Sequence, residues 1–236
     1  MPPEAQSAPV AFVTGAAGGI GRAVVQRLAA SGLRVCATDI APAAGALRVD
    51  VTDPESIAQG LATCVSRFGR VDHVVHLAGR AGEGGIDAIT VEDWRALIDT
   101  NLTSAFLVAR AAHALLRATR GSLTLMASTN GRNGGSALSG PAYAAAKAGV
   151  LNLSRHLAKE WAGEGIRVNC VAPGPIDTAM VARFDAATRE RLAASVPLGR
   201  IGTADEVAAA VAFLVGSDAS YVTGAVMNVS GGLVLD

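Results

Sequence analysis

The chain has 236 residues, with 20 Lys and Arg against 20 Asp and Glu, and half of it is apolar. A net charge of zero argues against a nucleic-acid-binding protein, which usually carries a basic face. This apolar content argues against a disordered chain. The longest apolar run, Val207 to Val215, is much shorter than the ~20 residues of a membrane span. The length suits one α/β domain, and we expect a single domain over residues 1–236.

The cysteines and the N-terminus favour a cytoplasmic protein. Cys36, Cys64 and Cys170 are odd in number, far apart and set in apolar runs. Buried free thiols in a reducing compartment explain them better than a metal or redox site does. The segment from Met1 to Pro9 has neither the basic nor the apolar region of a secretory signal. We therefore expect no metal, no membrane contact and no nucleic acid.

Strand-like and helix-like segments alternate along the chain. The apolar patterns predict strands at Val10–Thr14, Arg34–Asp39, Leu47–Asp50, Asp72–Leu77, Ser122–Ala127, Ile166–Ala172 and Ala225–Val229. They predict helices at Ile20–Ala30, Pro54–Phe68, Ala142–Ala162 and Ala204–Val215, and two more within Val91–Leu116 that break near Thr100. Asp53 is the expected N-cap of the helix at Pro54–Phe68. This alternation predicts a parallel sheet covered on both faces. Only Ile40–Ala46 joins two strands without room for a helix.

A glycine-rich loop follows the first predicted strand and opens the first helix. It reads Thr14-Gly15-Ala16-Ala17-Gly18-Gly19-Ile20-Gly21. Glycines allow a tight turn and the close approach of a phosphate, and a helix N-terminus offers free N–H groups. The loop predicts a diphosphate cradle formed by Gly15, Gly18, Gly19, Ile20 and Gly21. The alternative is a plain turn between strand and helix.

Asp39 ends the second strand, roughly 20 residues beyond the loop. A carboxylate at this place can accept hydrogen bonds from both hydroxyls of an adenosine ribose, and it repels a 2′-phosphate. Residues 40–46 contain no Lys or Arg to pair with such a phosphate. We therefore expect NAD rather than NADP as the cofactor. A strand-end turn is the alternative for Asp39.

Tyr143 and Lys147 are four residues apart in the long predicted helix, so their side chains share one face. A phenol with a pKa near 10 is a poor acid–base catalyst at neutral pH, and a neighbouring ammonium lowers that pKa. Tyr143 could then exchange a proton with a carbonyl or alcohol oxygen. Lys147 is one of two lysines in the chain and lies among alanines. These features favour a catalytic pair over a solvated helix face.

Several segments together carry a family resemblance over essentially the whole chain. They are Thr14-Gly15-x-x-x-Gly19-x-Gly21, Asp50-Val51, Asn101-Leu102-Thr103-Ser104, Ser128, Tyr143-x-x-x-Lys147, Pro173-Gly174-Pro175-Ile176-Asp177-Thr178 and the ending from Arg200 to Gly232. The chain resembles the short-chain dehydrogenase/reductase family. The resemblance implies a Rossmann-like, doubly wound parallel sheet of about seven strands with helices on both faces. It also implies an oxidoreductase acting on CH–OH groups.

The resemblance assigns roles to individual residues. Tyr143 would be the general acid/base, and Lys147 would hold the nicotinamide ribose and lower the pKa of Tyr143. Ser128 would bind the substrate oxygen, and Asn101 would hold a water that leads protons to solvent. The other implied cofactor contacts are Asp50 and Val51 at the adenine, Ala78 and Gly79 after the fourth strand, and Pro173, Gly174, Ile176 and Thr178 at the nicotinamide. A helix N-cap is the alternative for Asn101 and for Thr178.

The chain departs from the family pattern in three places. The usual Asn-Asn-Ala-Gly is His76-Leu77-Ala78-Gly79, and we expect His76 to be a hydrogen-bonded strand-end residue rather than a catalyst. Ser128 precedes Tyr143 by fifteen residues instead of about thirteen. Asn130 stands at the usual spacing, but the small residues around Ser128 favour the serine. The helix after the second strand is largely missing.

Substrate contacts are expected from residues 130–141 and from a lid over residues 177–200. Asn130, Met180 and Phe184 are the candidate contacts beside Ser128. Arg132 and Arg183 are possible polar contacts in this lining, but a solvated surface position explains each of them better. A lid of this kind closes over the reacting atoms and excludes water.

Three functions remain open. The first is an NAD-dependent dehydrogenase that interconverts a secondary alcohol and a ketone on a small or cyclic metabolite. The second is a 3-oxoacyl-thioester or 3-oxoacyl-[acyl-carrier-protein] reductase, a branch that mostly uses NADPH. The third is a non-catalytic dinucleotide-binding protein, which the presence of Ser128, Tyr143 and Lys147 disfavours. Apolar residues beyond one stripe of the helices at 101–116 and 142–162, and the family resemblance, predict a homotetramer.

Overall fold

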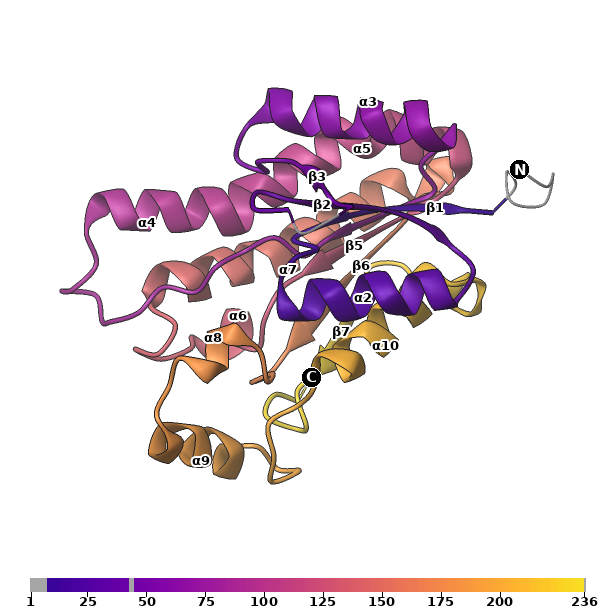
Figure 1. The fold of residues 1–236 in the computed structure, drawn as a ribbon. Coiled ribbons are helices and arrows are strands. Elements are labelled where there is room, and N and C mark those ends of the chain that lie inside the picture. The colour runs from indigo at the N-terminus through magenta and orange to yellow at the C-terminus, as the bar shows by residue number, and fades with distance from the viewer. Residues whose placement is uncertain (1–7, 43–44, 236) are drawn as a thin grey trace.

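The computed structural model describes residues 8–42 and 45–235. These residues form one sheet of seven parallel strands in the order β3-β2-β1-β4-β5-β6-β7 (Figure 1). The strands are β1 (Val10–Thr14), β2 (Arg34–Asp39), β3 (Leu47–Arg48), β4 (His73–His76), β5 (Ser122–Met126), β6 (Arg167–Pro173) and β7 (Val226–Val229). The Rossmann-like fold predicted from the sequence is therefore confirmed. Its strand order reverses between β1 and β4, and this is the place where such sheets bind ligands.

The predicted strands are all present in the described part of the chain, with ends that move by one or two residues. The largest change is at β3, which ends at Arg48 rather than Asp50. Between β2 and β3 the described residues form no helix, as expected, and residues 43 and 44 lie outside the described residues. Residues 1–7, where no secretory signal was expected, lie outside them as well.

Helices cover both faces of the sheet (Figure 1). Buried side chains of α2 and α10 pack on one face, and those of α3, α5 and α7 pack on the other. The helices are α2 (Gly19–Ala30), α3 (Pro54–Phe68), α4 (Val91–Ile98), α5 (Ser104–Thr119), α6 (Asn130–Asn133), α7 (Pro141–Trp161), α8 (Ala179–Ala182), α9 (Ala186–Ser195) and α10 (Ala204–Val215). The predicted cap of α3 is confirmed, because the Asp53 carboxylate accepts hydrogen bonds from the backbone N–H groups of Glu55 and Ser56.

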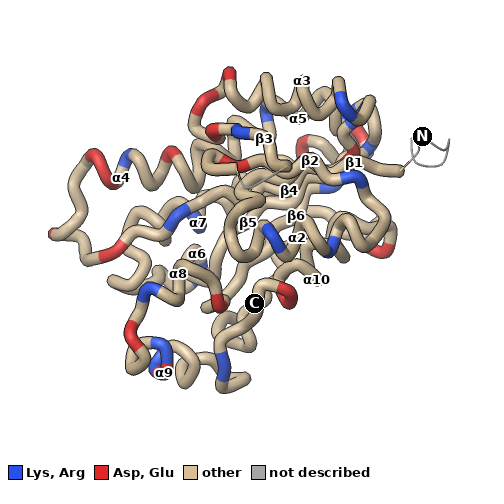
Figure 2. Tube along the Cα trace, viewed as in Figure 1, with Lys and Arg blue, Asp and Glu red and all other residues tan. Residues whose placement is uncertain are grey.

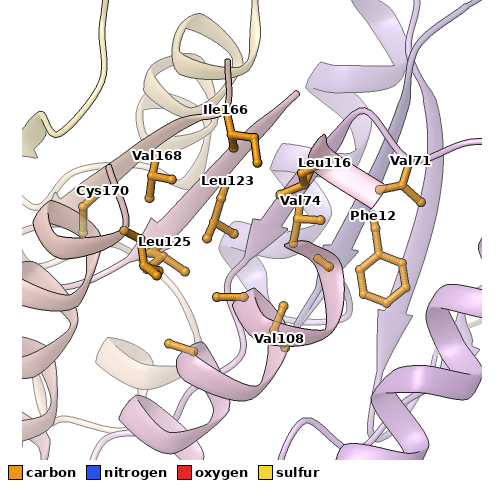
Figure 3. Close-up of a cluster of buried hydrophobic side chains, with 14 of the residues drawn as sticks. Phe12, Val71, Val74, Val108, Leu116, Leu123, Leu125, Ile166, Val168 and Cys170 are labelled. Atoms are coloured by element: carbon orange, nitrogen blue, oxygen red, sulfur yellow. The ribbon is translucent and has the colours of Figure 1, made fainter. Parts of the chain in front are cut away.

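The alternation of side chains along β1 divides the core into two layers. Val10 and Phe12 pack with α3 and α5, and Ala11 and Val13 pack with α2 and α10. Figure 3 shows the first layer around Phe12, Val74 and Leu123. The three cysteines are free and buried, as predicted. No His, Cys, Asp or Glu cluster among the described residues could hold a metal ion.

The predicted break near Thr100 is a π-helical segment, η1 (Asp99–Thr103), that joins α4 to α5. A π turn holds more residues than an α turn, and such turns occur often at functional sites. Here the helix continues through the segment instead of ending. The sequence therefore predicted the place of the irregularity but not its form.

The segment over residues 177–200 contains two short helices, α8 and α9, that lie beside the main body (Figure 1). None of the residues of α9 is buried. Basic and acidic residues occur close together on this segment (Figure 2), where Arg189 pairs with Asp177 at 3.2 Å. Within the described residues, no helix has the length and apolar character needed to span a membrane.

Candidate active site and dinucleotide cradle

Two cavities adjoin each other at the carboxyl ends of the strands. We call the larger one, of about 550 Å³, the cradle cavity, and the smaller one, of about 200 Å³, the substrate cavity. The glycine loop, Asp39 and Val51 line the cradle cavity, and Ser128 and Tyr143 line the substrate cavity. The residues that line both are Ile20, Leu77, Gly79, Met126, Thr178 and Met180. An elongated ligand could therefore occupy both.

The glycine loop requires glycine at two positions. Gly15 has a φ of +68°, and a Cβ atom there would lie 2.7 Å from the backbone nitrogen of Ala78. A Cβ atom at Gly21 would lie 2.0 Å from the carbonyl oxygen of Gly15. Gly18 takes the N-cap position of α2, so the first turn of this helix leaves N–H groups without intrahelical partners at the cradle cavity. These groups fit a diphosphate.

Asp39 is held against the glycine loop at the end of β2. Its carboxylate accepts hydrogen bonds from the backbone N–H of Ala17 at 2.9 Å and from that of Ala41 at 3.1 Å. Asp50 lines the same cavity, and hydrogen bonds from the Thr52 hydroxyl and backbone lower its pKa. Among the described residues that line the cradle cavity, Arg80 is the one basic side chain. The wall near Asp39 and Asp50 is thus acidic.

Ser128, Tyr143 and Lys147 meet in the substrate cavity and are all buried. Ser128 follows β5, and its hydroxyl lies near enough to the Tyr143 phenol to lower the pKa of that phenol. The Lys147 Nζ atom donates to the carbonyl oxygen of Met126 at 2.8 Å and lies 5.6 Å from the centre of the Tyr143 ring. The alternative to Ser128, Asn130, turns its amide toward the Ser139 hydroxyl at 2.7 Å.

Burial sets the pKa values of this pair. It raises the pKa of Tyr143, and the nearby Ser128 hydroxyl acts in the opposite direction. The expectation that Lys147 lowers the pKa of Tyr143 is therefore not met in this structure. Burial also lowers the pKa of Lys147 to about 8, because its ammonium is removed from water.

Asn101 lies buried in η1 and is not a helix N-cap. Its side-chain Nδ2 donates to the carbonyl oxygens of Arg80 and Leu97, and its Oδ1 accepts from the Arg80 N–H. A Cβ atom at Gly79 would lie 2.7 Å from this Oδ1 and 3.3 Å from the Lys147 Nζ atom. The structure thus brings Gly79, Asn101 and Lys147 together where the two cavities adjoin.

His76 has a hydrogen-bond partner on each ring nitrogen, as expected for a strand-end residue. The Thr14 hydroxyl lies 2.8 Å from Nδ1, and the Ser104 hydroxyl lies 3.1 Å from Nε2. Burial, with a further contribution from Lys147, lowers the pKa of His76 to about 3. The ring is therefore neutral at physiological pH.

The Pro173-Gly174 turn and the residues after it line the region where the two cavities adjoin. Pro173, Gly174 and Ile176 line the substrate cavity, and Thr178 lines both cavities. Thr178 stands at the N-cap position of α8, but its hydroxyl bonds the Ile176 carbonyl oxygen at 3.3 Å instead of capping the helix. The N-cap role that was the alternative for Thr178 is therefore not observed.

Met180 and Phe184 line the substrate cavity, with Leu138 and Leu192 beside them. Arg183 lines it as well, in agreement with the alternative of a polar contact. It is exposed, but its Nη2 atom donates to the carbonyl oxygens of Gly82 and Leu138. The sequence could not predict these two partners, because the two carbonyls belong to loops far away in the chain.

The family model described as "Enoyl-(Acyl carrier protein) reductase" matches residues 15–234. With the fold and the Tyr143–Lys147 arrangement, this match shows that the chain belongs to the short-chain dehydrogenase/reductase family. It is an oxidoreductase of that family that acts on CH–OH groups and uses NAD or NADP.

Known proteins resemble the chain over nearly its full length. The 3-oxoacyl-[acyl-carrier-protein] reductase FabG of Escherichia coli is 40% identical over 241 residues, which cover 96% of this chain and 97% of that protein. The cis-4-hydroxycyclohexanecarboxylate dehydrogenase of Sinomonas cyclohexanicum is 39% identical, with 97% and 98% covered. The solved structure of gox2181 has a TM-score of 0.91 at 33% identity, with 96% and 95% covered. The aldohexose dehydrogenase of Thermoplasma acidophilum has a TM-score of 0.89 at 29% identity, with 97% and 94% covered.

Proposed function

We propose that this protein interconverts a secondary alcohol and a ketone with NAD(H), with Tyr143 as the general acid/base. The observation that carries the proposal is that Ser128, Tyr143 and Lys147 are buried together in a cavity that adjoins the glycine cradle. When bound, the dinucleotide supplies or accepts the hydride. Tyr143 exchanges a proton with the substrate oxygen, and Ser128 orients that oxygen by a hydrogen bond. Lys147 holds the nicotinamide ribose, and Asn101 holds a water that leads the proton toward solvent.

Asp39 and Asp50 support NAD as the cofactor. A 2′-phosphate on the adenosine ribose would bring two negative charges to a wall that already carries two carboxylates. Within the described part of the chain, Arg80 is the one basic residue on the wall of the cradle cavity. It follows Gly79, which lies at the boundary between the two cavities. The charge distribution thus favours ribose hydroxyls beside Asp39 over a phosphate.

The names of the relatives support a 3-oxoacyl thioester as substrate, which was the second of the functions predicted from the sequence. Reductases named for 3-oxoacyl-[acyl-carrier-protein] occur repeatedly among the relatives at 35–40% identity. A dehydrogenase of a cyclic hydroxy acid is as similar, at 39% identity. We therefore place a 3-oxoacyl thioester first among substrates and a cyclic secondary alcohol second, with NAD(H) in either case.

Initial rates with two cofactors and two ketones test the proposal. Oxidation of NADH and of NADPH would be followed with acetoacetyl-coenzyme A and with cyclohexanone. We expect the kcat/KM for NADH to exceed that for NADPH by at least about tenfold, which is about 1.4 kcal/mol. A preference for NADPH would refute the role of Asp39. Absence of turnover across a wider panel of ketones would refute the proposed reaction.

A cytoplasmic homotetramer remains part of the proposal. The buried free cysteines support a reducing compartment. Phe106 on α5 is 46% exposed and lines a cavity with Leu153 and Trp161 of α7. Exposed apolar side chains of this kind are typical of a subunit contact. Light scattering of the purified protein would distinguish a tetramer from a monomer.

A further inference from the structure

The wall of the substrate cavity is positive on its exposed side. Within the described part of the chain, Lys147 and Arg183 are its charged residues, and no Asp or Glu lines it. Lys147 is buried and bonded to the Met126 carbonyl oxygen. The Arg183 guanidinium is exposed at the segment over residues 177–200. It makes no ion pair with any described residue within 4 Å.

The guanidinium of Arg183 is held in place. Its Nη2 atom donates to the Gly82 carbonyl oxygen at 3.1 Å and to the Leu138 carbonyl oxygen at 2.6 Å. The two loops that carry these oxygens are themselves joined, since the Gly82 N–H donates to the Ser139 carbonyl oxygen at 3.0 Å. The guanidinium carbon also lies 4.8 Å from the centre of the Phe184 ring. A ligand therefore meets a group that has already lost most of its rotational freedom.

This anchoring leaves donors for a ligand. A guanidinium has five N–H groups in a planar fork. The two carbonyl oxygens engage the Nη2 atom, and the structure shows no hydrogen bond of the described residues to Nε or Nη1 of Arg183. Planar anions such as a carboxylate accept two parallel N–H groups from such a fork. Arg183 thus has the charge, the position and the spare donors to bind an anion.

We infer that Arg183 binds an anionic group of the substrate, at the end away from the carbonyl held by Ser128 and Tyr143. The inference rests on the proposed function and deepens the second substrate class named there: the cyclic secondary alcohol would be a small hydroxy acid, and its ketone the matching oxo acid. A free carboxylate and the phosphate of a thioester carrier share the required chemistry. The cavity of about 200 Å³ favours the compact acid.

Binding measurements on the NADH complex test the inference. Calorimetry would compare 4-oxocyclohexanecarboxylate with its neutral carboxamide, and acetoacetyl-coenzyme A with acetoacetyl-N-acetylcysteamine, which lacks the carrier phosphates. We expect the carboxylate to bind about tenfold more tightly than the carboxamide, as a charged hydrogen bond would give. Arg183→Gln should abolish this preference, and Arg183→Lys should retain part of it. Arg191→Gln, on exposed α9 and outside the cavity wall, is the matched control and should keep the preference.

Equal binding of carboxylate and carboxamide, or a preference that survives Arg183→Gln, would overturn the inference. A second outcome would be tighter binding of acetoacetyl-coenzyme A than of acetoacetyl-N-acetylcysteamine, lost in Arg183→Gln, without any preference for the carboxylate over the carboxamide. This outcome would refute the small acid as substrate and show that Arg183 binds a phosphate of the thioester carrier. Thermal melts of the Arg183 variants would show whether they are folded. Because these experiments measure binding, a carboxylate preference without turnover would count against the proposed reaction and not against Arg183.

Discussion

The Thr14 hydroxyl lies 2.8 Å from Nδ1 of His76, and this contact joins the first residue of the glycine loop to the end of β4. On the other side of the ring, the Ser104 hydroxyl donates its proton to the Thr100 carbonyl oxygen at 2.6 Å. Ser104 must therefore accept a hydrogen bond from Nε2 of His76, which leaves Nδ1 to accept from Thr14. The neutral ring with its proton on Nε2 satisfies every group.

Replacing His76 tests whether this chain of hydrogen bonds positions the cradle. His76→Phe should lower the free energy of unfolding by about 1–3 kcal/mol, because Thr14 and Ser104 lose a buried partner. It should also weaken NAD binding, since Thr14 accepts hydrogen bonds from the backbone N–H groups of Leu77 and Ala78 beside the cradle. His76→Asn retains a donor and an acceptor and should recover part of the affinity. Denaturant titration and calorimetry measure the two effects, and equal NAD affinity in all three proteins would refute the role.

Acid should destabilise the protein through two buried histidines. Burial lowers the pKa of His76 to about 3 and that of His73 to about 4, whereas both titrate near 6.5 in an unfolded chain. Between pH 6.5 and about 4 the unfolded chain binds more protons, so the free energy of unfolding falls as the pH falls through this window. Above pH 6.5 the two residues contribute no slope. Urea titrations from pH 7.5 to 4.5 should show this decline, and it should flatten in a His73→Asn, His76→Asn variant but not in exposed His156→Asn.

Tyr143→Phe removes only the phenol hydroxyl. Because this hydroxyl is the proposed proton donor and acceptor, kcat should fall by about 10²–10⁴-fold while NAD affinity stays within twofold of wild type. Tyr221→Phe, at the other and fully exposed tyrosine, is the control. Stopped-flow kinetics and cofactor titration provide the two readouts. Turnover that survives in Tyr143→Phe would contradict its catalytic role.

Lys147→Met should stabilise the protein and inactivate it. The pKa of Lys147 is lowered to about 8 against 10.5 in water, so folding at pH 7 buries a charged ammonium at a cost. Removing it should raise the free energy of unfolding by about 1–3 kcal/mol at pH 7. The gain should shrink between pH 8 and 10.5, where the folded wild type has already released the proton and the unfolded chain has not. A less stable variant at pH 7 would show that the hydrogen bond to Met126 outweighs the burial of charge.

Asp39→Asn should relax the discrimination between the two cofactors. The asparagine keeps the shape of the side chain and removes the charge that repels a 2′-phosphate. We expect the Kd of NADP to fall about tenfold, while that of NAD rises a few-fold. Asp53→Asn makes the same charge change at the cap of α3, outside the cradle wall, and should leave both values unchanged. Fluorescence titration of each cofactor measures these constants.

The sequence predicted best where a pattern is local. Periodic apolar residues placed the strands, and Asp53 followed by Pro54 marked the start of α3 within one residue. The Tyr143–Lys147 pair needed only the helical repeat. Where a contact joins distant segments, no such pattern exists. The bonds from Arg183 to Gly82 and Leu138 span 101 and 45 residues, and the sequence marks neither.

Electrostatic environment is a second limit. A lysine four residues from a tyrosine suggests a lowered phenol pKa, but the direction depends on how much water both groups lose. Both side chains are buried, and burial outweighs any attraction between them. The degree of burial is a property of the packed molecule, so spacing alone could not have predicted it.

The π-helical segment η1 lets the two halves of one continuous helix pack against different parts of the molecule. Before it, Leu97 of α4 packs against Gly82. A Cβ atom added to Gly82 would lie 2.8 Å from the Cδ1 atom of Leu97. After it, Val108 and Leu116 of α5 fill the core. A π turn shifts the angular phase of the helix, so the apolar stripes of α4 and α5 need not align. Deleting one residue there would close the π turn to an ordinary α turn, so that α4 and α5 would stay helical and keep their faces toward the same neighbours.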